Sequence, residues 1–185
     1  MHELILGGQK SGKSRCAEQR ALQWLAAGAP REALLIATAL AGDAEMRERI
    51  ERHRADRAAR VPALAAIEAP HALPEALRAH GAAQRLLVVD CLTLWLTQCL
   101  LPPPGHAAAS DGEAAADALL AALRAAPGPV VLVSNEIGLG GIAMGREARR
   151  FADALGRLHQ RVAEVCARVT LMVAGLAMTV KEPQR

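Results

Sequence analysis

The chain has 185 residues, enough for one domain with a substantial core, and its formal net charge of +3 is mild. Aromatic residues make up only 2% of it, so it offers few stacking platforms for single-stranded nucleic acid, and the longest apolar stretches are too short to cross a bilayer. The four cysteines show no zinc-site spacing and lie mostly in apolar segments, which favours a reducing compartment. We therefore expect a single cytoplasmic domain over residues 1–185, with no nucleic-acid partner and no membrane span.

The first predicted elements are a buried strand at residues 4–6, a glycine-rich loop, and a helix over residues 14–27. The loop reads G-G-Q-K-S-G-K-S and fits the phosphate-binding pattern G-x-x-x-x-G-K-[ST] at every fixed position. Backbone N–H groups of such a loop, together with the N-terminus of the next helix, converge on phosphate oxygens. The sequence therefore predicts a nucleoside triphosphate site formed by Gly7, Gly8, Gln9, Lys10, Ser11, Gly12, Lys13 and Ser14.

Apolar runs after the first helix predict further strands at residues 34–38, 86–90, 130–134 and 169–173. Each run is continuously apolar, which is typical of parallel strands covered on both faces. Helical patterns separate them: residues 43–60 with Asp43 as N-cap, a segment opened by a Ser110–Glu113 capping box and ending near residues 127–128, and residues 146–168. A surface loop is expected at residues 102–105. The alternation predicts an α/β fold, a three-layer P-loop NTPase sandwich with a mostly parallel central sheet.

The last predicted helix carries one apolar stripe, formed by Phe151, Leu155, Leu158, Val162 and Val165. This stripe suits either the core of the monomer or an interface between subunits.

Two acidic residues lie where predicted strands end. Asp90 has the position of the second acid of a P-loop site, which orients Mg²⁺ or its water, and Ser14 supplies a hydroxyl for the same ion. Alternatively, Asp90 caps a helix that starts at residues 91–92. Glu136 follows the strand at residues 130–134 and either faces the nucleotide or second substrate, or is a polar strand terminus. We predict Ser14 and Asp90 as Mg²⁺ ligands.

Residues 43–60 contain a histidine on the helix face that carries the apolar anchors. Met46, Ile50, His53 and Arg57 recur at helical spacing. Neighbouring arginines disfavour the imidazolium, and a neutral imidazole is a competent nucleophile. The alternative is a solvated basic helix with an incidental histidine.

Segments spread over nearly the whole chain carry a more specific signal: Gly7–Arg15 with Ala17-Glu18, Ile36–Thr38, Glu45–Ile50 with His53 and Arg57, Val89–Trp95, Val133–Gly138, and Arg146 with Ala148, Arg149 and Phe151. Together they resemble the bifunctional adenosylcobinamide kinase/adenosylcobinamide-phosphate guanylyltransferase family of cobalamin biosynthesis. The family usually has paired histidines, whereas Arg52 precedes His53 here.

The resemblance implies two reactions and their substrates. The kinase passes a γ-phosphate from ATP or GTP to the aminopropanol hydroxyl of adenosylcobinamide. The guanylyltransferase then transfers GMP from GTP to adenosylcobinamide phosphate, giving adenosylcobinamide-GDP and pyrophosphate. The guanylylated histidine of the family falls on His53, which together with Lys13 would be catalytic and would form a GMP-histidine phosphoramidate.

The resemblance also implies further nucleotide-binding residues and a homo-oligomer, a trimer. These residues are Ala37, Thr38, Ala39, Arg54, Ala55, Asp56, Arg57, Glu68 and Asp90. The Glu68 carboxylate would accept the guanine N1–H and N2–H groups.

Two other functions remain compatible with the residues. One is a P-loop small-molecule kinase without the guanylyltransferase step, in which His53 is structural. The other is a non-catalytic module that senses GTP or binds cobinamide.

Overall fold

The computed structural model describes residues 1–28, 30–102, 111–140 and 145–182. In this part of the chain, seven strands form one sheet in the order β3-β2-β4-β5-β1-β6-β7. The strands are β1 Glu3–Gly7, β2 Glu32–Ala37, β3 Ala65–Glu68, β4 Arg85–Asp90, β5 Val130–Asn135, β6 Arg168–Val173 and β7 Leu176–Lys181. Only β7 pairs antiparallel within this sheet, so the prediction of a mostly parallel sheet is confirmed. The loop predicted at residues 102–105 lies outside the described residues from 103 onward.

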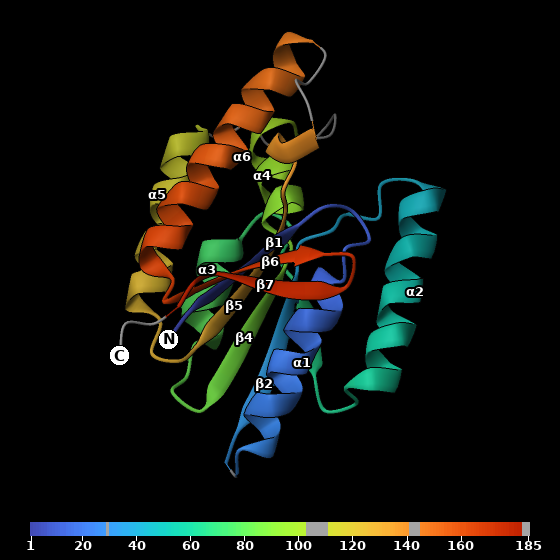
Figure 1. The fold of residues 1–185 in the computed structure, drawn as a ribbon, viewed down its shortest axis with the longest axis vertical. Helices are drawn as coiled ribbons and strands as arrows, with labels where there is room; N and C mark the ends of the chain where they lie inside the picture. Colours follow the sequence, from blue (N-terminus) through green and yellow to red (C-terminus); the bar gives the residue numbers. More distant parts are fainter. Residues whose placement is uncertain (29, 103–110, 141–144, 183–185) are drawn as a thin grey trace.

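Helices lie on both sides of the sheet, as Figure 1 shows. They are α1 Lys13–Ala26, α2 Ala44–Arg60, α3 Leu73–His80, α4 Leu92–Leu100, α5 Gly112–Ala125 and α6 Arg146–Val165, with a 3-10 turn, η1, at Gly138–Gly140. Helices α3 to α6 cover one face of the sheet and α1 covers the other, while α2 stands beyond α1. The predicted three-layer α/β sandwich is confirmed. None of the described helices has the length and apolar character needed to cross a membrane.

The strands are apolar at successive positions because both faces of the sheet are covered. Leu4 and Leu87 pack into the cluster formed with α3 to α6, whereas Ile5 and Val88 pack into the cluster formed with α1. The largest fully buried side chain is Trp95 of α4. The core therefore lies in two layers, and the carboxyl ends of the parallel strands meet at one edge of the sheet.

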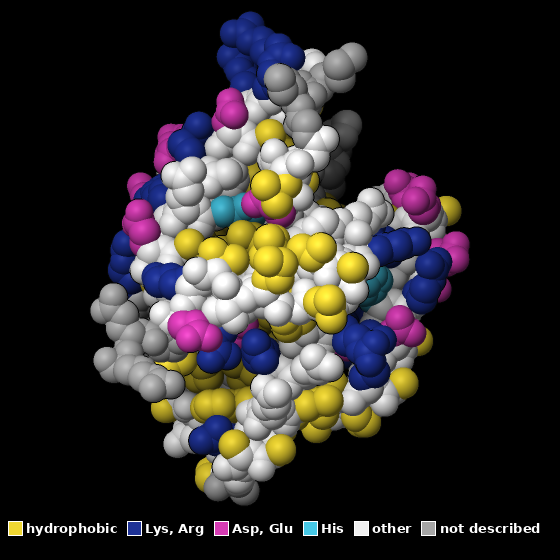
Figure 2. All heavy atoms as spheres, viewed as in Figure 1, with side chains coloured by type: hydrophobic (Ala, Val, Ile, Leu, Met, Phe, Trp, Pro, Cys, Tyr) yellow, Lys and Arg dark blue, Asp and Glu magenta, His cyan; other side chains and the backbone are white. Residues whose placement is uncertain are grey.

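Strand β7 forms an uncovered edge of the sheet. All six of its residues are exposed, and apolar side chains are exposed at Val173, Leu176, Met178 and Val180. Figure 2 shows hydrophobic side chains gathered over β6 and β7 on this face of the molecule.

Helix α6 ends three residues earlier than predicted. Cys166 is extended, and the Ala167 and Arg168 N–H groups donate to the His2 carbonyl, so this segment joins the sheet beside β1. The apolar stripe of α6 packs in the core of the monomer: Leu155, Leu158 and Val162 are buried, and Phe151 and Val165 pack against them. The core alternative for this stripe is therefore correct.

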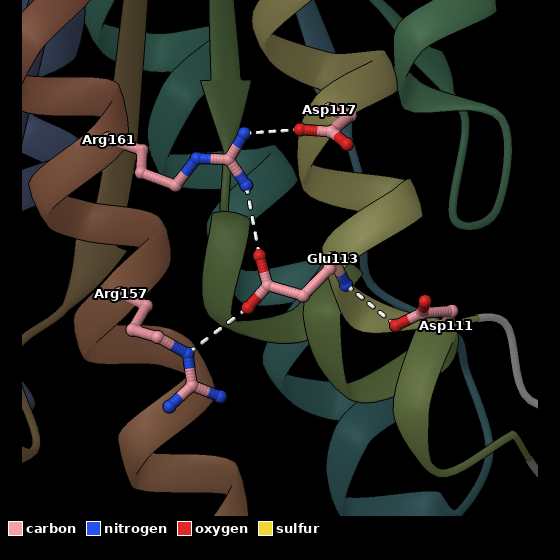
Figure 3. Close-up of polar contacts among 5 residues, drawn as sticks. All are labelled: Asp111, Glu113, Asp117, Arg157 and Arg161. Atoms are coloured by element: carbon pink, nitrogen blue, oxygen red, sulfur yellow. Dashed lines mark hydrogen bonds and ion pairs between the residues drawn. The ribbon is translucent and has the colours of Figure 1, made fainter.

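The start of α5 differs from the predicted capping box. Ser110 lies outside the described residues, and Asp111 is the N-cap, its Oδ1 accepting from the Glu113 N–H at 3.0 Å. The Glu113 carboxylate turns to α6, where Arg157 and Arg161 bind it at 3.1 Å each (Figure 3). The described helix thus has Asp111 as its N-cap where Ser110 was predicted, and the predicted bonds between Ser110 and Glu113 lie outside the described residues.

Candidate nucleotide site

The loop between β1 and α1 turns tightly enough to surround a small anion. Gly12 is left-handed at φ 99° and forms the N-cap of α1. At Gly7 an added Cβ would lie 2.6 Å from the Met172 carbonyl oxygen and from Ser11 Oγ, so a side chain does not fit there. The Lys13 side chain folds back over the loop, and its Nζ donates to the Gly8 carbonyl at 2.6 Å. The predicted phosphate-loop residues thus gather at the N-terminus of α1.

The loop contains a buried hydroxyl that lacks a protein partner. Ser11 Oγ is buried and makes no hydrogen bond to any described residue. Because an unsatisfied buried polar group is costly, an added acceptor such as a ligand oxygen or a water would stabilise it. Burial also lowers the pKa of Lys13, and the negative charge of Asp90 counteracts this shift. A phosphate group fits both observations, since it accepts from the hydroxyl and neutralises the ammonium group.

The turn between β6 and β7 supports the phosphate loop from the other end of the chain. Ala174 and Gly175 both have positive φ, as a two-residue hairpin turn requires. The Gly175 N–H donates to the Ser11 carbonyl at 3.0 Å. The conformation of the loop therefore depends on residues about 160 positions later in the sequence.

Asp90 lies beside the start of α1. Ser14 Oγ donates to Asp90 Oδ2 at 3.4 Å, so the two predicted Mg²⁺ ligands are neighbours. Burial raises the pKa of Asp90, whereas the positive charges of His53 and Arg57 and the Ser14 hydrogen bond lower it. The alternative that Asp90 caps α4 is wrong, since Cys91 is the N-cap and no side chain caps that helix.

The described residues contain no cluster of three or more His, Cys, Asp or Glu able to hold a metal. Mg²⁺ needs no such cluster, because it takes most of its ligands from phosphates and water and only one or two from protein. The neighbouring oxygens of Ser14 and Asp90 fit that requirement.

Helix α2 has its histidine-bearing face turned toward this site without entering the core. No residue of α2 is buried; Met46, Ile50 and Arg57 are half-buried and His53 is exposed. A charge on His53 would lower the pKa of Asp90, and the charge of Arg49 lowers the pKa of Lys13. The predicted apolar face of α2 therefore exists, but it borders the phosphate site instead of the hydrophobic core.

Ion pairs hold α2 to its neighbours. Arg54 pairs with Glu68 at the end of β3, and Arg60 binds Glu18 of α1 at 2.6 Å. Asp56 lies 3.9 Å from Arg60, and Ala55 is exposed. The structure thus brings Arg54 and Glu68 together, while the side chain of Asp56 forms no ion pair with the described residues of the phosphate loop.

Thr38 fixes the position of Asp90. Its hydroxyl donates to the Cys91 carbonyl at 2.7 Å and accepts from the Cys91 N–H at 2.8 Å, and its own N–H donates to the Asp90 carbonyl. Gln98 Nε2 donates to its carbonyl oxygen. Ala37 and Ala39, on either side, are half-buried.

A buried polar cluster beside the loop contains residues that sequence reasoning missed. Glu136 lies there with Thr93, Ser134 and His159. His159 follows Leu155 by four residues, so a lone polar residue on the apolar stripe of α6 was the available signal.

A separate cavity lies between α4, α5 and α6. Its volume is about 610 Å³, and its walls include Leu96, Phe151 and the Glu113–Arg157 pair. None of its described lining residues belongs to the phosphate loop or to α2.

Comparison with known proteins identifies close relatives. Residues 3–180 match the family described as cobinamide kinase / cobinamide phosphate guanyltransferase. The bifunctional adenosylcobalamin biosynthesis protein CobP of Pseudomonas aeruginosa is 50% identical over 181 residues, covering 98% of both chains. The bifunctional adenosylcobalamin biosynthesis protein CobU of Salmonella typhimurium is 34% identical, covering 96% of this chain and 98% of the relative.

Among solved structures, the flagellar accessory protein FlaH from Methanocaldococcus jannaschii is similar with a TM-score of 0.50. Its sequence identity is 11%, and the match covers 98% of this chain and 78% of FlaH. This likeness concerns the fold alone.

Proposed function

Because this chain belongs to the cobinamide kinase / cobinamide phosphate guanyltransferase family, we propose that its phosphate loop serves both transfers and that His53 carries the guanylyl group between them. The chain is a bifunctional enzyme of adenosylcobalamin biosynthesis, with kinase and guanylyltransferase activities toward cobinamide and its phosphate. This assignment fits the substrates expected from the sequence. They are ATP or GTP with adenosylcobinamide for the first reaction, and GTP with adenosylcobinamide phosphate for the second. Residues 1–185 would act as one catalytic domain.

In the proposed nucleotide complex, the loop residues Gly7 to Ser14 surround the phosphates. Lys13 exchanges its contact with the Gly8 carbonyl for the β- and γ-phosphate oxygens, and Ser11 Oγ gains the acceptor that it lacks. Ser14 and Asp90 would hold Mg²⁺, which neutralises charge on the phosphates when bound.

The observation that carries the proposal for His53 is the orientation of α2. Helix α2 is joined to α1 by the Arg60–Glu18 pair and to the end of β3 by the Arg54–Glu68 pair. A charge on His53 would lower the pKa of Asp90, which supports a position of this histidine on the side of the phosphate site. A ring nitrogen attacks the α-phosphorus of GTP, a P–N bond forms, and the bond to the leaving pyrophosphate breaks. A phosphate oxygen of the acceptor then attacks the same phosphorus, and the electron pair of the P–N bond returns to the imidazole.

Guanine recognition would use the ion pair at the end of β3. Glu68 offers two carboxylate oxygens to the guanine N1–H and N2–H groups, which adenine does not present in that pattern. Arg54 occupies this carboxylate now, so guanine binding would displace it. The guanidinium groups of Arg54 and Arg57 would then be available to phosphate oxygens. The residues Ala37, Thr38 and Ala39 would supply backbone groups at the end of β2, and Ala55 and Asp56 would border the nucleotide from α2.

Incubation with GTP labelled at the α-phosphate tests this function. We expect an acid-labile, base-stable GMP adduct on the wild-type protein and none on His53→Ala, which keeps its kinase activity. The matched control is His80→Ala on α3, which should form the adduct normally. Phosphorylation of cobinamide without any adduct would favour the small-molecule kinase, and saturable GTP binding without either product would favour the sensing module.

We also propose a cytoplasmic homo-oligomer, a trimer by family resemblance. The exposed side chains of Val173, Leu176, Met178 and Val180 support self-association, because apolar strand edges are normally covered. The buried thiols of Cys16, Cys91 and Cys166 form no disulfide, as expected in a reducing compartment. Sedimentation equilibrium would measure the subunit number.

A further inference from the structure

The sheet order places the end of β5 between the two halves of the nucleotide site. Strand β5 lies between β1, which leads into the phosphate loop, and β4, which ends at Asp90. Asn135 pairs with Gly7 in register, and the Glu136 N–H donates to the Gly7 carbonyl at 3.0 Å. Glu136, the residue that follows β5, therefore lies next to the first residues of the phosphate loop.

Glu136 ends a continuous chain of polar contacts that runs into the core. His159 Nδ1 lies 3.5 Å from Glu136 Oε2, and His159 Nε2 lies 2.7 Å from Ser134 Oγ. Ser134 Oγ lies 3.0 Å from Thr93 Oγ1, which accepts from the Asn135 N–H at 2.9 Å. The His159 side chain is 7% exposed and that of Glu136 is 22% exposed. Among these groups, the carboxylate is the end that solvent and substrate reach.

The hydrogen bonds have only one consistent direction when His159 is neutral. Burial lowers the pKa of His159, and Glu136 opposes that shift. Because a carboxylate accepts but does not donate, a neutral His159 with its proton on Nδ1 turns an N–H toward Glu136, 3.5 Å away, and leaves Nε2 to accept from the Ser134 hydroxyl. Ser134 then accepts from the Thr93 hydroxyl, so every proton in the chain has an assigned acceptor.

Stability alone would not require polar side chains in this cluster. Apolar side chains of similar size would fill the same space without the cost of desolvating an imidazole and two hydroxyls. The second oxygen of Glu136 is fixed as well, since Oε1 accepts from the Gly138 N–H at 2.8 Å. The carboxylate is thus oriented beside the loop by a hydrogen bond from Gly138 on one oxygen and by the neighbouring imidazole of His159 on the other.

We propose that Glu136 is the general base of the kinase step and that His159 is a positioning residue, which holds this carboxylate toward the acceptor hydroxyl. The inference rests on the proposed function. The hydroxyl gives its proton to Glu136 while its oxygen forms a bond to the γ-phosphorus, and the bond from that phosphorus to the bridging oxygen breaks. The electron pair leaves with the nucleoside diphosphate, and Glu136 releases the proton to water after product departure.

The second reaction needs no such base, because the acceptor of GMP is a phosphate that already carries negative charge. The two activities should therefore respond differently to a change at Glu136, and this difference separates the inference from the proposed function.

The decisive variant is Glu136→Gln, which keeps size and hydrogen bonding but removes the basic carboxylate. We expect the kcat of cobinamide phosphorylation to fall about 10²- to 10⁴-fold, with the KM for nucleotide and the rate of His53 guanylylation within about threefold of wild type. The control is Glu164→Gln, an exposed position on α6. Kinase activity within about threefold of wild type, or equal loss of both activities, would overturn the inference. Absence of both activities from the wild-type protein would instead refute the proposed function.

A matched pair of variants tests the positioning role. His159→Asn keeps an amide N–H near the Nδ1 position, and His159→Gln keeps a polar group near the Nε2 position. If His159 acts through Glu136, the Asn variant should retain at least tenfold more kinase kcat than the Gln variant at similar thermal stability. Equal kinase rates, or a higher rate in the Gln variant, would show that the imidazole serves only the contact with Ser134.

Discussion

At the scale of single residues, Lys13 makes a contact that nucleotide binding must break. Its ammonium group is bonded to the Gly8 carbonyl, and burial lowers its pKa, so the loop holds a desolvated cation ready for exchange. Such a preorganised charge acts most strongly where negative charge develops in the transition state.

Lys13→Ala should therefore reduce kcat/KM of both transfers by about 10²- to 10³-fold, the usual cost of removing one preorganised donor. Steady-state assays of phosphorylation and adduct formation measure this effect. Lys181→Ala, at the end of β7, serves as the control and should leave both rates unchanged. Near-normal rates in Lys13→Ala would contradict the assignment of the phosphate loop.

Thr38 is the second residue whose contribution follows from its bonds. Thr38→Val removes the hydroxyl but keeps the shape, and it leaves the buried Cys91 N–H without an acceptor. We expect the free energy of unfolding in urea to fall by about 1–3 kcal/mol. Thr179→Val on exposed β7 should change it by less than about 0.5 kcal/mol. An equal effect in the two variants would show that the bonds to Cys91 contribute nothing.

The phosphate loop and Asp90 could be predicted because their chemistry lies in short, local patterns. The Thr93–Ser134–His159 chain could not, because its members come from α4, β5 and α6, and only tertiary packing joins them. Helical spacing left His53 as either a nucleophile or an incidental residue, and only the family resemblance favoured the nucleophile. The sequence does not show that the helix stays outside the core.

At the scale of elements, α2 is held by polar contacts. The Arg54–Glu68 pair is exposed on both sides, at 55% and 61%, and such pairs add little stability. A helix anchored in this way can approach bound GTP without disrupting the core.

Glu68→Gln should accordingly change the free energy of unfolding by less than about 1 kcal/mol. The KM for GTP in adduct formation should nevertheless rise about tenfold or more, because guanine loses a charged acceptor. Urea unfolding and rates of adduct formation measure the two effects, with Glu75→Gln on α3 as control. An unchanged KM would exclude Glu68 from guanine recognition.

Elements were predictable where their apolar pattern is strong. The five predicted strands correspond to β1, β2, β4, β5 and β6, and the helix start at residues 91–92 corresponds to α4. Strand β3, helix α3 and strand β7 were not predicted. Strand β3 is short and rich in alanine, and β7 is an exposed edge, so neither has the continuous apolar run that marks a buried strand.

At the scale of the whole molecule, the buried thiols should make the free energy of unfolding decrease at alkaline pH. Burial raises the pKa of Cys91 to about 11 and that of Cys166 to about 12, from 9.0. Above pH 9 the unfolded chain therefore loses thiol protons that the folded chain retains. Since the unfolded state then binds fewer protons, stability falls as pH rises from about 9 to about 11.

The free energy of unfolding should decrease by up to about 1.4 kcal/mol per pH unit for each thiol in that window. Urea unfolding at pH 8.5, 9.5 and 10.5 checks this slope, and the chain contains no tyrosine that would titrate alongside. Cys166→Ala should reduce this slope by the contribution of about one thiol. A wild-type slope of zero would contradict the burial of both thiols in solution.

The class of fold followed from the alternation of strands and helices, but the order of strands did not. No local pattern states that β5 lies between β1 and β4, because that order is set by how the connecting helices pack. The sequence accordingly left open whether Glu136 faces the nucleotide or second substrate or is only a polar strand terminus. The fold places it beside the phosphate loop.

The support of the phosphate loop by the β6–β7 turn has a consequence for biosynthesis on the ribosome. Strand β1 leaves the exit tunnel well before its neighbours in the sheet, β5 and β6, and Thr170 binds Glu3 across 167 positions. A nascent chain therefore carries its glycine-rich segment unpaired until those strands have emerged. Its capacity to capture GTP should arise abruptly, once the region around Gly175 has emerged.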